Sequence, residues 1–154
     1  VTNKNLAVEL CRVDRLVAVV PPNHEFANRE TMHIKDLLKY PYICREEGSG
    51  TREVILEYLD QLGLLKEELN IIMELGSPEA LKGAVEAGIG VTIISRATLN
   101  KELKLGTLVA IDLEPPLERP FSFVHQKQKF RQHTVEKLLE FARQYCHDHP
   151  TPEV

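Results

Sequence analysis

Short runs of apolar residues alternate along the chain with stretches in which apolar side chains recur every three or four positions. The runs predict strands, and the recurring pattern predicts helices. Strands are expected at residues 6–10, 16–20, 42–44, 70–75, 91–95, 108–113 and 121–125. Helices are expected at 36–38, 52–62, 78–88, 96–103 and 134–146, with a turn at Pro115-Pro116. This alternation predicts an α/β sheet with right-handed crossovers.

The composition narrows the class of protein. Of the 154 residues, 43% are hydrophobic and 27% are charged, which is typical of a soluble globular chain. No apolar run approaches the roughly 18 residues of a membrane span, and no secretory leader is visible. A net charge of −4 argues against nucleic-acid binding by this segment, because phosphate contacts need clustered Lys and Arg. Since the chain opens at Val1 and enters a strand pattern within a few residues, we expect a fragment of a longer protein.

Cysteines and histidines, which often serve as catalytic residues or metal ligands, are present but do not form a known catalytic or metal-binding motif. Cys11, Cys44 and Cys146 are odd in number and widely spaced, and no CxxC or Cys/His pattern includes them. We interpret them as reduced cytosolic thiols. The six histidines form no HxxxH or HExxH arrangement, and no GxSxG elbow occurs. We therefore expect no metal, no cofactor and no catalytic residues.

The most informative stretch is a turn between the strand at 42–44 and the helix at 52–62. Its sequence, REEGSGTR at 45–52, offers backbone amides and hydroxyls to an anion at a helix N-terminus. It is neither a Walker loop nor a dinucleotide fingerprint. From the pattern alone, an anion cradle and an ordinary capped turn have similar weight. The candidate binding residues are Glu46, Gly48, Ser49, Gly50 and Thr51.

Two other strand ends carry candidate ligand-binding residues. Gly76 and Ser77 precede a helix, although Ser-Pro-Glu is fully explained by helix capping. Ser95 and Arg96 follow the strand at 91–95, where the guanidinium could pair with an anion or simply be solvated. Open α/β sheets bind ligands at the carboxyl ends of their strands, so these turns could face one ligand.

An ordered set of motifs resembles the effector-binding domain of LysR-type transcriptional regulators. The set includes REEGSGTR at 45–52, ELGSPEALKGAVEAGIGVTIIS at 74–95 and LKLGTL at 103–108, in the family's order and spacing. The resemblance extends from about Leu16 to His125. The first two motifs are most similar to the subgroup that regulates sulfur assimilation and carbon-dioxide fixation.

The resemblance implies a two-subdomain region similar to type 2 periplasmic binding proteins, with a ligand in the cleft. It implies that residues 1–20 are hinge crossing strands, 21–113 the second subdomain, 119–126 the return crossing and 134–146 a C-terminal helix. The DNA-binding domain and most of the first subdomain would be absent. The family's cleft contacts from this half fall on Glu46 to Thr51, Gly76-Ser77 and Ser95-Arg96.

The expected function is sensing by the regulatory domain of a cytoplasmic regulator that is not an enzyme. A small anionic metabolite would act as co-inducer, and the signal would pass through rearrangement of a homodimer or homotetramer. Arg96 or Arg45 would pair with the anion, and the helix at 52–62 would form part of the subunit interface. Promoter DNA would be bound only through the absent N-terminal domain, and no membrane is involved. The alternatives are a periplasmic-type solute-binding protein for a small anion, and an anion-handling enzyme.

Overall fold

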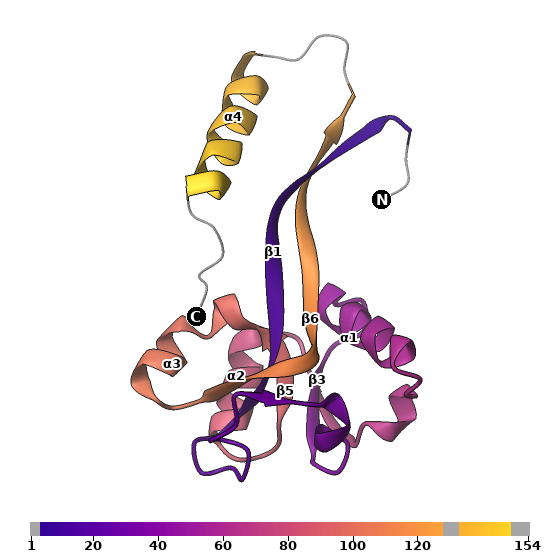
Figure 1. Ribbon diagram of the computed structural model, residues 1–154, viewed down its shortest axis with the longest axis vertical. Helices are drawn as coiled ribbons and strands as arrows, with labels where there is room; N and C mark the ends of the chain where they lie inside the picture. Colours follow the sequence, from indigo (N-terminus) through magenta and orange to yellow (C-terminus); the bar gives the residue numbers. More distant parts are fainter. Residues whose placement is uncertain (1–3, 128–132, 149–154) are drawn as a thin grey trace. The chain divides into compact units, whose positions relative to one another are not determined.

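The computed structural model describes residues 4–127 and 133–148 (Figure 1). Its strands are β1 (Leu6–Val20), β2 (Thr31–Met32), β3 (Tyr42–Arg45), β4 (Ile71–Leu75), β5 (Thr92–Ser95) and β6 (Val109–Gln126). Its α-helices are α1 (Gly50–Gln61), α2 (Pro78–Glu86), α3 (Asn100–Leu105) and α4 (His133–Asp148). The chain divides into two compact units, residues 15–118 and residues 1–14 with 119–154.

In the unit formed by residues 15–118, strands β3, β4 and β5 point in the same direction. β3 pairs in parallel with β4, from Tyr42 opposite Ile71 to Arg45 opposite Leu75. A parallel bridge from Tyr42 to Val91 leads from β3 to β5. β5 pairs antiparallel with β1, and β2 pairs in parallel with β6. The α/β class predicted from the alternation is confirmed.

Helices cover both faces of β1 in this unit. Leu16, Ala18 and Val20 belong to a core cluster that includes Ile55 and Leu59 of α1. Val17 and Val19, which point to the opposite face, belong to a second cluster that includes Leu81 and Val85 of α2. Figure 1 shows α1 and α2 on the two sides of these strands. The uninterrupted apolar run at 16–20 therefore reflects a strand buried on both faces.

β1 is one continuous strand where the sequence predicted two. The charged stretch between residues 10 and 16 was expected to interrupt it. The structure keeps the strand because Asp14, which is almost fully buried, pairs with Arg119 on β6 at 2.9 Å between Nε and Oδ2. Satisfying a buried charge in this way allows extended backbone to pass through a polar position.

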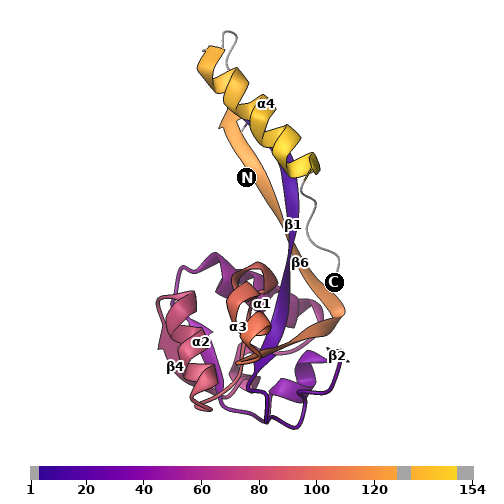
Figure 2. The same ribbon diagram turned by 90° about the vertical axis from the view of Figure 1, so that its left-hand side faces the viewer.

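The turn predicted at Pro115-Pro116 is wrong, because β6 continues through both prolines. Leu113 and Leu117, on either side, are both buried, whereas Pro115 and Pro116 are exposed. The Glu114-Pro115 peptide is cis. The Pro115 carbonyl accepts a hydrogen bond from the hydroxyl of Tyr58 on α1 at 2.6 Å. Figure 2 shows β1 and β6 as two long neighbouring strands.

In the other unit, α4 packs on the first half of β1. Arg143 of α4 makes two hydrogen bonds to the carboxylate of Glu9, at 2.7 and 2.9 Å. Cys146 forms a disulfide with Cys11. The interpretation of all three cysteines as reduced thiols is therefore wrong for this pair, whereas Cys44 is free and buried. Spacing could not reveal the pair, because the two cysteines are 135 residues apart and meet only when α4 lies on β1.

Among the described residues, no helix combines the length and the apolar character that crossing a bilayer requires.

Candidate functional site

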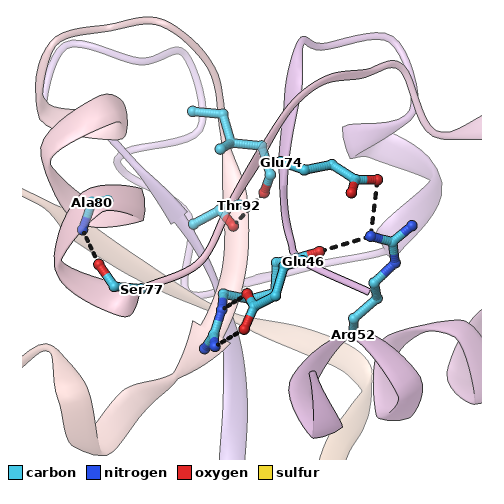
Figure 3. A network of polar contacts seen from close by, with 8 residues as sticks. Glu46, Arg52, Glu74, Ser77, Ala80 and Thr92 are labelled. Atoms are coloured by element: carbon cyan, nitrogen blue, oxygen red, sulfur yellow. Dashed lines mark hydrogen bonds and ion pairs between the residues drawn. The ribbon is translucent and has the colours of Figure 1, made fainter. Parts of the chain in front are cut away.

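The three candidate turns follow strands that end at one edge of the unit formed by residues 15–118. Ile43 donates its backbone N–H to the Val91 carbonyl at 2.9 Å, and the Thr92 hydroxyl donates to the Ile43 carbonyl at 2.7 Å (Figure 3). These bonds hold β5 beside β3, while the ladder holds β4 on the other side. Ser95 is the last residue of β5, and the other predicted binding residues follow the carboxyl ends of β3, β4 and β5.

The turn after β3 leads into the N-terminus of α1, which has no side-chain cap from Ser49. Gly48 has a φ of +82°, which favours glycine, and the Ser49 amide donates to the Glu46 carbonyl at 3.2 Å. Ser49 is the N-cap residue of α1, but its buried hydroxyl accepts no hydrogen bond from the first-turn amides. The first-turn amides of a helix point out of its N-terminus and carry the positive end of the helix dipole. The turn therefore lacks the side-chain cap that the alternative interpretation, an ordinary capped turn, would include at Ser49.

Arg45 and Glu46 form a bidentate ion pair at the end of β3. The Arg45 Nε and Nη2 atoms donate to the two carboxylate oxygens of Glu46 at 2.7 and 2.8 Å (Figure 3). These hydrogen bonds lower the pKa of Glu46 to about 2, so its carboxylate is ionised at neutral pH. The guanidinium of Arg45 is thereby committed to a neighbour in the chain.

Arg52, to which the sequence assigned no role, joins the turn to β4. Its Nη1 atom donates to the Arg45 carbonyl at 3.0 Å and lies 2.8 Å from Oε1 of Glu74 on β4. The pKa of Glu74 is lowered by this contact. Arg52 shares a helical stripe with the buried residues Ile55 and Leu59, which was the available signal that it points inward. It fixes the geometry of the turn.

Ser77 confirms the capping interpretation favoured for the turn after β4. Its Oγ atom accepts a hydrogen bond from the Ala80 amide at 3.1 Å, and Pro78 opens the helix (Figure 3). Ser77 and Gly76 lie at the shared edge, but this hydroxyl is already used by α2. The N-terminus of α2 is thus capped, in contrast to that of α1.

Arg96, after β5, is held more loosely than Arg45. Its Nη1 atom lies 3.9 Å from Oδ1 of Asp112, which is too long for a hydrogen bond. Asp112 accepts a hydrogen bond from Arg15 through its other oxygen, and its buried Oδ1 has no hydrogen-bond partner among the described residues. Ser95, the residue before Arg96, is buried. Among the described residues, Arg96 thus has a more distant acidic neighbour than Arg45 has.

Metal ligands are not gathered at this edge. Within residues 4–127 and 133–148, no group of three or more His, Cys, Asp or Glu side chains could hold a metal ion. What the edge offers is a set of hydrogen-bond donors, from backbone amides, hydroxyls and a guanidinium. Such a set can bind an oxyanion.

Two known proteins that are similar to this chain in sequence are transcriptional regulators. The chain is 42% identical to the HTH-type transcriptional regulator MJ0300 of Methanocaldococcus jannaschii over 106 residues, which cover 69% of this chain and 36% of that protein. It is 29% identical to the RuBisCO operon transcriptional regulator of Allochromatium vinosum over 153 residues, covering 94% of this chain and 49% of that protein. The chain thus spans half or less of the length of these curated relatives.

A solved structure and a family model agree with these relatives. The regulatory domain of CcmR from Synechocystis PCC6803, solved in complex with 2-PG, is similar with a TM-score of 0.85 at 23% identity, covering 98% of this chain and 73% of that chain. The periplasmic-binding-protein-like fold implied by the resemblance is confirmed. Residues 2–147 match the model of the LysR substrate binding domain. The chain therefore belongs to the LysR substrate binding domain family.

Proposed function

We propose that this chain is the effector-sensing part of a LysR-type transcriptional regulator, and that the edge beyond β3, β4 and β5 binds a small anionic metabolite. The observation that carries the proposal is the start of α1 at this edge, where the N-cap residue Ser49 is buried and its side chain makes no capping hydrogen bond. An anion would accept hydrogen bonds from the first-turn amides and from the hydroxyls of Ser49 and Thr51. The site binds and releases its ligand unchanged.

Arg96 supplies the charge that selects an anion in this proposal. A guanidinium can donate two parallel hydrogen bonds to a carboxylate, phosphate or sulfate. The 3.9 Å separation from Asp112 lets Arg96 turn to a ligand without breaking a hydrogen bond. Arg45 would first have to release Glu46. We therefore propose that Arg96 binds the anion and that the Arg45-Glu46 pair has a structural role.

The relatives suggest which anions to try first. CcmR, whose regulatory domain was solved with 2-PG, and the RuBisCO operon regulator both resemble this chain. We propose a sugar-phosphate or phospho-acid ligand, or an intermediate of sulfur assimilation, acting as co-inducer. Its binding would favour one arrangement of a homodimer or homotetramer and thereby change promoter affinity.

The unit containing α4 supports the proposal that a further part of the effector region packs here. Its described residues leave several large apolar side chains at least 46% exposed, namely Val8, Leu10, Phe121, Val124, Leu138 and Phe141. Apolar surface on this scale usually marks a contact. In our proposal residues 21–113 are the second subdomain, 1–20 and 119–126 cross between subdomains, and 134–146 packs on the first subdomain. Promoter DNA is bound in the cytoplasm by another domain of the complete protein.

A thermal-shift experiment on the complete protein tests the binding proposal. Phosphate, sulfate and 2-PG are added in turn, and a ligand of the folded state raises the midpoint of unfolding. We expect at least one of them to do so, and Ser49→Ala to reduce the rise. Ser122→Ala, which removes an exposed hydroxyl from β6, is the matched control and should respond like the wild type. An equal rise in the wild type and Ser49→Ala would show that the α1 turn does not bind the anion.

A further inference from the structure

Cys11 and Cys146 belong to one row of contacts between β1 and α4. Leu139, Arg143 and Cys146 follow one another by four and three residues, so they lie on the same face of α4. Glu9 and Cys11, two residues apart on β1, also share a face. The Glu9-Arg143 ion pair and the cysteine pair are therefore successive contacts along one interface.

This interface brings the cysteines together by contacts other than the S–S bond. Two hydrogen bonds between Arg143 and Glu9 hold α4 on β1, and Leu139 on the same face of α4 is buried. Glu9 also contacts His125 of β6 at 2.8 Å between Oε1 and Nε2. The Cα atoms of the two cysteines are 6.0 Å apart, within the usual range for a disulfide. Reduced thiols would thus remain close enough to react.

The surroundings of this pair differ from those of the third cysteine. Cys11 and Cys146 are both partly exposed to solvent, whereas Cys44 is 5% exposed within the core. Burial also raises the pKa of the Cys44 thiol, which disfavours the reactive thiolate. In the part of the protein that the structure describes, a dissolved thiol or disulfide therefore reaches the pair more readily than it reaches Cys44.

We propose that Cys11 and Cys146 are a reversible thiol-disulfide site that fastens α4 to β1 when oxidised and leaves α4 held by non-covalent contacts when reduced. The inference rests on the proposed function, because a cytoplasmic regulator meets a reducing thiol pool in which a permanent disulfide is unusual. The reacting partner is a small disulfide such as oxidised glutathione. One protein thiolate attacks it and releases one glutathione thiol, and the second protein thiolate then displaces the other. The two protein thiols lose two electrons and two protons, and one disulfide is reduced to two thiols.

The test equilibrates the complete protein in buffers with different ratios of reduced to oxidised glutathione, and counts free thiols by alkylation and mass. We expect two thiols to disappear together within the range of ratios found in cytosol. The matched control Cys44→Ala keeps the pair and should show the same midpoint. Two results would overturn the proposal: a pair that stays closed at every cytosolic ratio, or cysteines that never lose two thiols together.

Hydrogen exchange then measures the effect on α4. We expect the amides of α4 to exchange at least about tenfold more slowly in the oxidised protein. Cys11→Ser and Cys146→Ser, either of which suffices if the other fails to fold, should exchange at the same rate in both buffers. Equal exchange in the oxidised and reduced wild type would contradict the fastening of α4. A different result would contradict the effector proposal. In that case neither the oxidised nor the reduced protein responds to the anions, although the two thiols still react as expected.

Discussion

Arg52, in the first turn of α1, lies 2.8 Å from the carboxylate of Glu74 on β4, measured from Nη1 to Oε1. The same nitrogen donates to the backbone carbonyl of Arg45 at the end of β3. One side chain therefore ties the helix that opens at the proposed anion site to the two strands that end there. Because its guanidinium is committed to these partners, we expect Arg52 to position the turn without touching the ligand.

Replacing Arg52 should destabilise the fold more than replacing its partner. Arg52→Met removes a buried donor from the Arg45 carbonyl, and we expect a loss of about 1–3 kcal/mol in the free energy of unfolding. Glu74→Gln should have a smaller effect, because the Glu74 side chain is 47% exposed and its charge is partly solvated. Urea unfolding of both variants measures the difference. Equal losses would mean that the bond to the Arg45 carbonyl contributes nothing.

The Arg45-Glu46 pair predicts a pH dependence. Arg45 holds the pKa of Glu46 at about 2 in the folded protein, below the ordinary value of 4.5. A depressed carboxyl pKa stabilises the fold above the unfolded-state pKa, and this stabilisation is lost as the pH falls from about 4.5 to about 2. Glu46→Gln has no such carboxyl.

Unfolding titrations at several pH values measure this contribution. The stability of Glu46→Gln should fall less steeply than that of the wild type between about pH 4.5 and pH 2. Glu47→Gln is the control, since it removes a neighbouring carboxyl of the same turn. Parallel curves for the wild type and Glu46→Gln would contradict the ion pair.

Local sequence signals predicted most of the elements at the site. The carboxyl ends of β4 and β5 and the Ser77 cap follow from short-range patterns of apolar, capping and glycine residues, and the end of β3 and the start of α1 lie within two residues of their predicted positions. The long strands were not predictable in this way. In the sequence, Asp14 indicates an interruption of the first strand. Its partner Arg119 lies 105 residues later, and only the pairing of the two makes Asp14 compatible with a buried strand.

Our proposal that Arg96 and not Arg45 binds the anion also rests on tertiary contacts. Both arginines follow a strand, so their positions in the sequence are equivalent. The structure separates them through their acidic neighbours: Glu46 holds Arg45 at hydrogen-bond distance, whereas Asp112 lies 3.9 Å from Arg96. Asp112 is 16 residues from Arg96, and its other oxygen is engaged by Arg15 of β1. The periodic pattern of apolar and polar residues does not show which acidic residue lies close to which arginine.

A buried ion pair between α2 and α3 provides a stability prediction. Lys82 and Glu102 lie 3.0 Å apart, with side chains 7% and 8% exposed. Lys82→Met leaves the Glu102 carboxylate without this counter-ion, and we expect a loss of about 3–5 kcal/mol. The double variant Lys82→Met/Glu102→Leu should recover most of it, because both charges are gone. Additive losses in chemical unfolding would show that the two residues act independently.

The edge of β4 predicts a surface for self-association, together with the neighbouring helix α1. Ile72 and Met73 on this strand are 47% and 37% exposed, although both are large and apolar. We expect Ile72→Lys/Met73→Lys to weaken dimerisation by introducing unpaired charges at the contact. Sedimentation of the complete protein measures the dissociation constant. Leu105→Lys, at an exposed apolar position on α3, is the control, and an unchanged constant in the β4 variant would place the contact elsewhere.

Calorimetric titration of the complete protein with 2-PG, and with sulfate if 2-PG gives no heat, tests the central claim most directly. We expect saturable binding to the wild type, and Arg96→Gln should weaken it by at least about tenfold through loss of a charged bidentate donor. Arg29→Gln, which removes an exposed arginine paired with Asp36, should bind like the wild type. Binding of equal strength to Arg96→Gln and the wild type would contradict the claim that the edge beyond β3, β4 and β5 recognises the anion.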